Sequence, residues 1–407
     1  MDKDTYLVLR VTSQEKDRFD PLDPFERGAD ARLGTPGVAD YRIEAQALDD
    51  REYRNLHRDR EVAGIARPIP VRLIAPVSGP QGVAPPGPVD GATWGVHVTG
   101  ALHSPYTGQG VTVAVLDTGI DADHEAFRGI ELAQKDFTGE GDGDRNGHGT
   151  HVAGTIFGQT VQGLRYAVAP GVRRALIGKV LGVRTSATTK EIIDAIQWAV
   201  DGGAHLINLS LGFDFPGLVR WWAEERKMPV DLATSRALAE YRDNVRFFDR
   251  LVALLQARAA RFSSALLIAA AGNESRRQLA ADYAIEVAPP AAADGIVAVA
   301  AVQTAGPPHT VLRVAPFSNI RAAMAAPGVG IHSAKAGGGY TSLDGTSMAS
   351  PPATGVAALW AERQLQRNGV VNSSTLDAQL CGNARRERLP EASYLDVGEG
   401  LVSAPLD

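Results

Sequence analysis

Three short motifs place an acid, an imidazole and a hydroxyl beside small residues. They are Asp117 in Asp-Thr-Gly, His148 in Asn-Gly-His-Gly-Thr-His and Ser347 in Gly-Thr-Ser-Met-Ala-Ser-Pro, in that order along the chain. A serine hydroxyl is a poor nucleophile at neutral pH unless a base takes its proton, and an acid must fix the tautomer of that base. Together the three residue types can make Ser347 a nucleophile.

Each motif has a simpler interpretation when it stands alone. Asp117 could belong to a turn after a strand, His148 could be a capping or core histidine, and Ser347 could be a helix N-cap. A metal site at His148 and His151 is disfavoured, because no glutamate lies between them as in the zinc pattern. The order and the local context of all three motifs favour catalysis.

The elements that must position these residues can be read from the apolar pattern. Residues 111–116 form a nearly continuous apolar run, which is typical of a parallel strand buried on both faces, and Asp117 follows it directly. His148 begins an expected helix, and Ser347 precedes an alanine-rich helix over 348–359. Backbone N–H groups at such a helix start suit an oxyanion on a substrate carbonyl.

Further strands and helices predict an α/β domain with a mostly parallel sheet flanked by helices. Strands are expected over 206–211, 265–271 and 295–302, and a helix over 190–201. The strand over 265–271 leads to Asn273, whose amide could donate to the same oxyanion. A helical insertion is expected at about 213–262. Its long helix over 232–261 is predicted to pack on the sheet through an apolar stripe that includes Leu238, and Trp221-Trp222 in the loop before it could be exposed.

Residues 1–75 are predicted to form a small α+β domain. Strands are expected over 6–11, 41–45 and 69–74, with a helix over 49–61 and an unassigned loop over 19–39. Residues 76–92 are rich in Pro and Gly and are expected to be a linker, so the main domain would span 93–407.

Composition excludes several classes of protein. The 407 residues are 44% hydrophobic and 22% charged, which is typical of a globular protein. The net charge of −6 argues against a nucleic-acid partner, and no apolar run approaches a membrane span. Cys381 is the single cysteine, and no signal segment follows Met1. We therefore expect a cytoplasmic protein, or a secreted one if a leader has been trimmed from the sequence.

The motifs resemble those of the subtilisin-like serine peptidases, the subtilase or peptidase S8 family, over roughly 94–405. This resemblance implies a catalytic triad of Asp117, His148 and Ser347, with Asn273 and the Ser347 N–H forming the oxyanion hole. It also implies that Ser210, Leu211 and Gly212 line the substrate cleft and pair with an extended peptide, while Ala270, Ala271 and Gly272 form the opposite wall of the pocket. Calcium binding is possible by the same resemblance.

The sequence departs from the family pattern at a few positions. Pro352 stands where a histidine is common, but the first turns of a helix tolerate proline. Calcium ligands cannot be matched to residues, and Asp142 and Asp144 fit a solvated acidic loop better than a cation site. Glu274, at the rim of the pocket for the residue before the scissile bond, would favour a basic side chain there.

The expected function is a serine endopeptidase that acts on peptides or proteins through an acyl-enzyme. Residues 1–75 resemble the inhibitory prodomain of such enzymes, which would make them an intramolecular partner; a permanent accessory domain is the other interpretation. The alternative function is a catalytically silent peptide-binding module on the same scaffold.

Overall fold

The computed structural model describes residues 3–12, 40–77, 87–183, 187–258, 264–306 and 311–407. The unassigned loop over 19–39 and residues 78–86 of the expected linker lie outside the described residues. Within the described chain, no helix is both long enough and apolar enough to cross a lipid bilayer.

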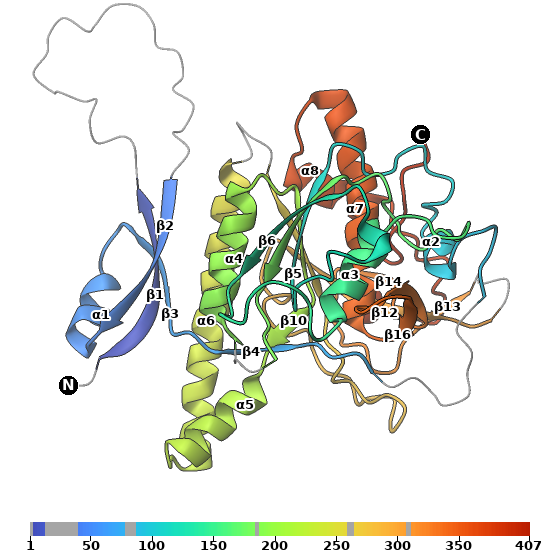
Figure 1. Cartoon of the computed structure of the whole chain (residues 1–407). Coiled ribbons are helices and arrows are strands. Elements are labelled where there is room, and N and C mark those ends of the chain that lie inside the picture. The colour runs from blue at the N-terminus through green and yellow to red at the C-terminus, as the bar shows by residue number, and fades with distance from the viewer. Residues whose placement is uncertain (1–2, 13–39, 78–86, 184–186, 259–263, 307–310) are drawn as a thin grey trace, which may run out of the picture.

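A mostly parallel sheet forms the centre of the molecule, which confirms the predicted α/β class (Figure 1). The strand order is β13-β12-β11-β9-β5-β7-β6, with β14 beside β12, and β13 is the antiparallel strand of this set. Continuous apolar runs form its middle strands because both faces of the sheet are covered. The strands are β5 (Thr112–Asp117), β6 (Glu131–Asp136), β7 (Arg174–Lys179), β9 (Leu206–Leu209), β11 (Leu266–Ala270), β12 (Ile296–Thr304), β13 (Leu312–Val314) and β14 (Met324–Pro327).

Helices cover both faces of this sheet, with α3 and α7 on one side and α4 and α6 on the other (Figure 1). The start of α4 is fixed by a capping box, in which Thr188 is the N-cap and Glu191 bonds back to its N–H. The helices of the main domain are α2 (Trp94–Val98), η2 (Glu125–Phe127), α3 (His148–Phe157), α4 (Thr189–Asp201), α5 (Phe215–Arg220), η3 (Trp221–Glu225), α6 (Val230–Arg258), α7 (Thr346–Asn368), α8 (Ser373–Gly382) and α9 (Tyr394–Val397).

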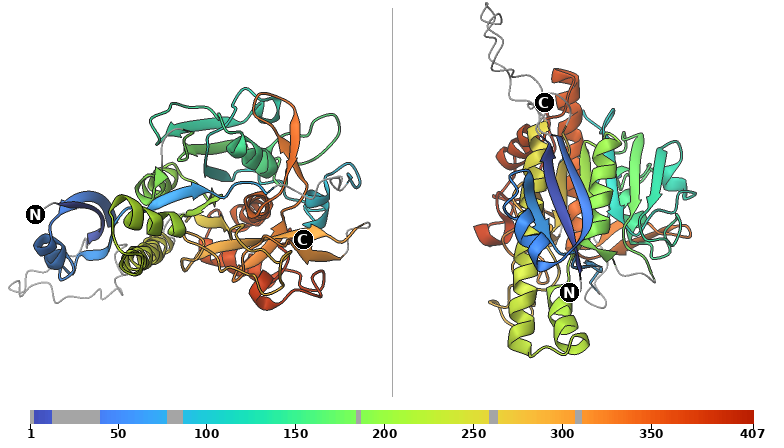
Figure 2. Two further views of the ribbon diagram at one scale, coloured as in Figure 1. Left: turned by 90° about the horizontal axis from the view of Figure 1, so that it is seen from below. Right: turned by 90° about the vertical axis from the view of Figure 1, so that its left-hand side faces the viewer.

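The N-terminal residues form an antiparallel sheet with one helix against it. Its strand order is β2-β1-β3, and Figure 2 shows it at one end of the molecule, beside α6. The expected helix over 49–61 is too long, because the chain leaves the helix after Leu56 and enters a strand that the sequence did not predict. These elements are β1 (Asp4–Thr12), β2 (Asp40–Leu48), α1 (Asp50–Leu56) and β3 (Val62–Ala66).

The strand expected over 69–74 does not join this N-terminal sheet. It is β4 (Pro70–Leu73), which lies between β10 (Leu211–Phe213) and β8 (Ala187–Thr188) and is antiparallel to both. A further hairpin joins β15 (Ile331–Ala334) to β16 (Tyr340–Leu343). The N-terminal chain therefore passes from its own sheet into the main domain along β4.

The inserted helices hold the N-terminal unit. The loop expected to expose two tryptophans is helical, and Trp222 is buried. The guanidinium of Arg67 lies 5.7 Å from the Trp222 ring, and the indole N–H donates to Glu240. Trp221 is 41% exposed. On α6, Phe247 packs against Gly64 of β3. Leu238 was expected on the buried stripe but is exposed, since the buried face turns toward both the sheet and the N-terminal unit.

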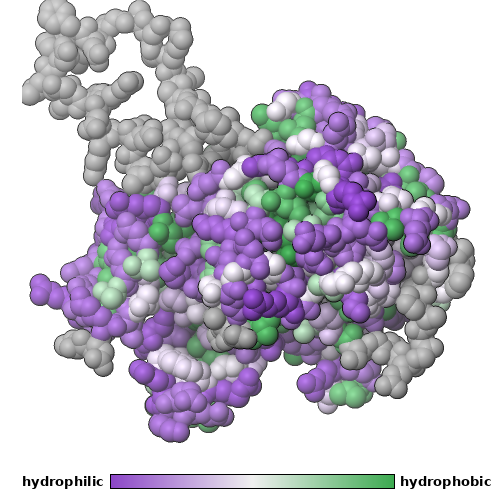
Figure 3. Space-filling view, viewed as in Figure 1, coloured by the Kyte–Doolittle hydropathy of each residue, from purple (hydrophilic) through white to green (hydrophobic). Residues whose placement is uncertain are grey.

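The face of the molecule seen in Figure 1 is mostly hydrophilic, with hydrophobic residues in small scattered groups (Figure 3). The large apolar side chains instead form a core cluster that includes Phe157, Phe248, Leu116 and Ile177. This distribution is that of a packed globular protein.

We predict that Gly355→Ala destabilises the protein. A Cβ at this position of α7 would lie 2.5 Å from Cβ of Val168, so packing at the helix must open. Such overpacking costs about 1–3 kcal/mol of unfolding free energy. The measurement is the urea midpoint by tryptophan fluorescence, made in a Ser347→Ala background.

Gly382→Ala is the matched control. A Cβ at Gly382, the last residue of α8, meets nothing within 4 Å, and alanine is the better helix former. Its urea midpoint should stay the same or rise. Equal midpoints for both variants would contradict the close packing of α7 on Val168.

Candidate active site

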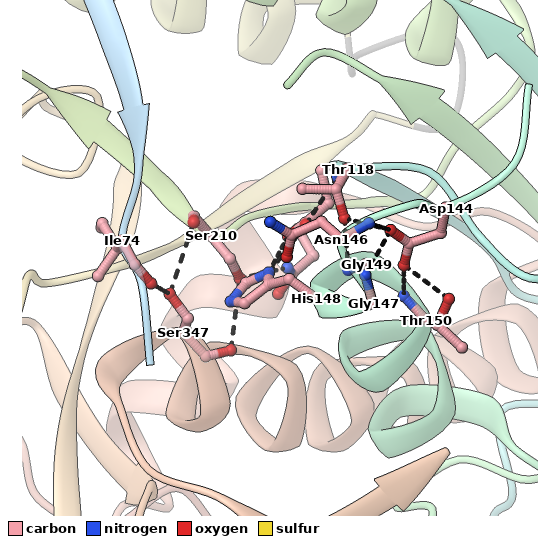
Figure 4. A network of polar contacts seen from close by, with 12 residues as sticks. Ile74, Thr118, Asp144, Asn146, Gly147, His148, Gly149, Thr150, Ser210 and Ser347 are labelled. Carbon is pink, nitrogen blue, oxygen red and sulfur yellow. Dashed lines mark hydrogen bonds and ion pairs between the residues drawn. The ribbon is translucent and has the colours of Figure 1, made fainter. Parts of the chain in front are cut away.

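The three reactive residues lie where a strand ends and two helices begin, and Figure 4 labels His148 and Ser347 among them. Asp117 is the last residue of β5, His148 is the first of α3, and Ser347 is the second of α7. Their exposed fractions are 0%, 2% and 0%. Residues far apart in the sequence are thus brought to the carboxyl end of the sheet, where α/β folds place their sites.

Asp117 fixes the orientation of the His148 ring. Nδ1 of His148 lies 2.8 Å from Oδ1 and 3.0 Å from Oδ2 of Asp117. Because a carboxylate only accepts hydrogen bonds, Nδ1 carries the proton and Nε2 is left as the basic atom. Nε2 is buried and has no hydrogen-bond partner among the described residues.

Ser347 faces the chain's own N-terminal segment. Its Oγ donates to the carbonyl oxygen of Ile74 at 2.6 Å, and its own carbonyl accepts from Oγ of Ser210 at 3.4 Å. The Ser347 carbonyl is available because Pro351, one turn later, has no N–H to donate to it. The hydroxyl therefore already contacts a peptide carbonyl at this site.

Asn273 also contacts that segment. Its Nδ2 donates to the carbonyl oxygen of Ala75 at 2.9 Å. Its Oδ1 accepts from both N and Oγ1 of Thr346, each at 2.8 Å, which fixes which end of the amide points into the cleft. A hydrogen-bond donor is therefore held beside Ser347, as an oxyanion hole requires.

The residues expected to line the cleft pair with the same segment. Gly212 is opposite Arg72 in the antiparallel register of β10 with β4, and the Ile74 N–H donates to the Ser210 carbonyl at 3.4 Å. The Ile74 side chain packs over Gly212, 3.5 Å from where a Cβ would lie. Ala270 ends β11, and the buried Ala271 and the adjoining Gly272 lead from it to Asn273.

Asp144 is a site residue that the sequence reasoning missed. Instead of forming a solvated loop, its carboxylate accepts from Oγ1 of Thr118 at 2.9 Å, Oγ1 of Thr150 at 2.7 Å and the N–H of Gly147 at 2.7 Å (Figure 4). These partners flank Asp117 and His148 in the chain. The sequence signal that could have identified Asp144 is its position four residues before His148, which begins a helix.

Other histidines near the motifs, and the single cysteine elsewhere, are not part of the reactive set. His151 is fully buried, burial and the nearby His148 lower its pKa to about 3, and its Nε2 bonds to the Ile331 carbonyl. His124 bonds to the backbone on both sides of its ring. Burial raises the pKa of the Cys381 thiol to about 11, which disfavours a reactive thiolate.

The described residues contain no group of three or more His, Cys, Asp or Glu side chains placed to hold a metal ion. Asp144 itself is occupied by backbone and hydroxyl donors. Calcium, which the resemblance makes possible, therefore has no side-chain cluster of this kind to hold it in the described part of the chain.

The arrangement has the parts needed for acyl transfer. A hydroxyl lies at a peptide carbonyl, an imidazole is held by a buried carboxylate, and an amide donor points into the same cleft. Ser347 is in the first turn of α7, where backbone N–H groups have no helical partner and can donate to a developing oxyanion.

We predict that Asp144→Asn slows acyl transfer without unfolding the protein. The amide replaces an accepting oxygen with a donor, so at least one of the bonds to Gly147 and Thr150 is lost and His148 shifts relative to Ser347. A displacement of about 1 Å can cost on the order of 100-fold in rate. The measurement is hydrolysis of a small activated ester.

Asp142→Asn is the control for this variant, because Asp142 is exposed in the same loop. It removes the same charge and should leave the rate unchanged. If both variants hydrolyse the ester at the wild-type rate, Asp144 does not position the site.

Comparisons with known proteins identify the family of this chain. The family model described as "Subtilase family" matches residues 108–394. The "Thermostable alkaline protease" of Halalkalibacterium halodurans is 32% identical over 302 residues, which are 73% of this chain and 67% of that protein. "Alkaline elastase YaB" of Bacillus sp. strain YaB is 34% identical, over 74% of this chain and 65% of that protein.

Similarity extends to a shorter relative and to a solved structure. "Subtilisin DY" of Bacillus licheniformis is 33% identical over 73% of this chain and 90% of that protein. The crystal structure of a cold adapted subtilisin-like serine proteinase is 26% identical with a TM-score of 0.55, covering 78% of this chain and 100% of that one. The match of the family model to most of the chain and the identities above 30% show that this chain belongs to the subtilase family of serine-type endopeptidases.

Proposed function

We propose that the chain hydrolyses peptide bonds through an acyl-enzyme on Ser347, with His148 as general base and acid and Asp117 orienting His148. The observation that supports this most directly is the contact of Ser347 Oγ with a peptide carbonyl, beside an imidazole held by a buried carboxylate. Peptides and proteins are the expected substrates.

The proposed reaction begins when the Ser347 hydroxyl turns from the substrate carbonyl oxygen to His148. Nε2 of His148 takes the proton as Oγ bonds to the carbonyl carbon, and Asp117 stabilises the imidazolium. His148 then gives the proton to the leaving amine as the C–N bond breaks. Water attacks the acyl-enzyme by the same steps in reverse, with His148 again as base, and frees Ser347.

Asn273 and the N–H of Ser347 are the proposed oxyanion donors. Thr346 orients the Asn273 amide before any substrate charge develops, so little reorganisation is needed in the transition state. Burial of the surrounding residues lowers the local dielectric, which strengthens these hydrogen bonds.

We further propose that the N-terminal unit is an intramolecular inhibitor that the enzyme cuts after Ile74. Two contacts support this: Ile74 N–H to Ser210 and the Ile74 carbonyl to Ser347. They give residues 70–75 the antiparallel register expected of a bound substrate. The Ile74–Ala75 peptide bond is then the one presented for cleavage, and the strand blocks other substrates while it stays in place. The Asn273 amide donates instead to the Ala75 carbonyl, one residue beyond this bond, so it must move to the Ile74 carbonyl for the cut.

Contacts away from the cleft support retention of the N-terminal unit after cleavage. The carbonyl of Arg67 accepts from Nδ2 of Asn244 on α6 at 2.8 Å. The guanidinium of Arg67 pairs with Glu240, also on α6, and with Asp4 of β1. Glu240 is 8% exposed at its side chain and also accepts from the indole of Trp222. These bonds do not depend on the Ile74–Ala75 peptide bond.

The catalytically silent binding module is not favoured. Such a protein has no need of a buried carboxylate on His148 or of a fixed amide beside Ser347, and both are present. It would be favoured only if the purified chain bound peptides and cleaved none.

We predict that the full chain cuts itself between Ile74 and Ala75. Intact-mass spectrometry after incubation should show two fragments, one ending at Ile74 and one beginning at Ala75. Because the segment already lies in its own cleft, the rate should not depend on protein concentration. Ser347→Ala should stay intact, and the same fragments from that variant would contradict the proposal.

We predict that Asn273→Ala lowers kcat strongly and changes KM little. Asn273 is proposed to act on the oxyanion and not on the ground state, and loss of such a donor in subtilisin costs about 10²–10³ in kcat. The measurement is steady-state hydrolysis of a quenched fluorescent peptide. A rise in KM with kcat unchanged would assign Asn273 to substrate binding instead.

A further inference from the structure

Arg72, two residues before Ile74, is held by carboxylates from two parts of the main domain. Its Nη2 lies 2.8 Å from Oε1 of Glu274, and its Nη1 lies 3.4 Å from Oδ1 of Asp214. The two carboxylate side chains are 32% and 23% exposed, so they are partly shielded from water. The guanidinium thus bridges two acids across the edge of the cleft.

Both carboxylates are oriented by bonds that do not involve Arg72. Oε2 of Glu274 accepts from Nδ2 of the buried Asn319 at 2.8 Å, and the Glu274 N–H donates to Oδ1 of Asn319 at 3.1 Å. Asp214 is the N-cap of α5, where its Oδ1 accepts from the Gly217 N–H at 3.0 Å. The two acids therefore keep their positions when the N-terminal segment leaves, and a new cation meets a preformed site.

The register of the strands decides which substrate residue reaches these acids. Gly212 is opposite Arg72 in the register of β10 with β4. Two residues on, the Ile74 N–H donates to the Ser210 carbonyl, and the Ile74 carbonyl contacts Ser347. Side chains alternate along a strand, so Arg72 and Ile74 point to the same side. Ile74 fills the pocket over Gly212, and Arg72 lies beyond it over Glu274 and Asp214.

We propose that Glu274 and Asp214 form a subsite that selects arginine, and less strongly lysine, as the third residue before the scissile bond of a peptide substrate. The inference rests on the proposed function of the same cleft. It differs from the expectation that Glu274 binds the residue directly before the bond, because that position is occupied by the apolar Ile74. Arginine is favoured because its two Nη groups reach two carboxylates at once, whereas lysine offers one ammonium group.

The hollow beside the subsite also contains Arg276, which is exposed. Its charge opposes a bound cation, and the two carboxylates outnumber it. Because all these groups are partly open to solvent, we expect a moderate preference that weakens with salt.

The test uses octapeptides with the sequence of residues 70–77 and with Arg, Lys, Gln or Glu at the third position before the Ile-Ala bond. Pairs of peptides are mixed with the self-cleaved full chain, and both products are measured in one tube. The ratio of rates then equals the ratio of kcat/KM, whatever fraction of the sites is still blocked by the N-terminal unit. We expect the Arg peptide to be cleaved about five- to tenfold faster than the Gln peptide, and the Glu peptide to be the slowest.

A double variant, Glu274→Gln with Asp214→Asn, removes both charges. Asparagine still caps a helix and glutamine still accepts from Asn319, so the cleft should keep its shape. The Arg-to-Gln ratio should fall to about one. Glu286→Gln is the matched control, because that carboxylate pairs with Arg321 at 2.7 Å and should leave the ratio unchanged.

Failure of the subsite and failure of the endopeptidase function give different results in this experiment. Equal cleavage of the Arg and Gln peptides by the wild type overturns the subsite and leaves the endopeptidase intact. A preference that survives in the double variant also overturns the assignment to these two acids. If no peptide is cleaved above the level of Ser347→Ala, the proposed function fails, and the inference fails with it.

Discussion

The site depends on one buried contact, between the carboxylate of Asp117 and the ring of His148. A carboxylate with no exposure to water is costly unless donors surround it. Its donors are Nδ1 of His148 and the N–H of Thr118, the latter at 2.7 Å. This contact joins the end of β5 to the start of α3. The close approach of these two segments also requires small residues in the motifs, because a Cβ on Gly149 would collide with the carbonyl of Gly119.

Asp144 and the cap of α7 extend the same principle to the rest of the site. Hydroxyl and backbone donors around Asp144 hold the loop before His148, and Thr346 holds Asn273. Reactive groups are thus positioned by neighbours that do not react, which is how a cleft keeps its geometry when the occupant changes. The occupant in this structure is the chain itself: β4 completes a small sheet with β8 and β10 and brings Ile74 to Ser347.

The sequence predicted the parts whose cause is local. Buried parallel strands leave continuous apolar runs, so β5, β9, β11 and β12 were expected close to where they lie. The motifs stand at their ends. What could not be predicted depends on contacts between distant segments. β3 contains Gly64, and glycine is unfavourable in a strand, but here it leaves room for the ring of Phe247 against the backbone. The strand pattern of β4 does not say which sheet it joins, and the contacts of the buried Trp222 include Arg67, which is far away in the sequence.

The central claim is that Ser347 is a nucleophile activated by His148 and Asp117. The most direct measurement is labelling with a small fluorophosphonate, followed by peptide mapping and by the rate of adduct formation. The account predicts one adduct, on Ser347, with the rate greatly reduced in His148→Ala. An adduct on another residue, or equal labelling of the wild type and His148→Ala, would contradict it.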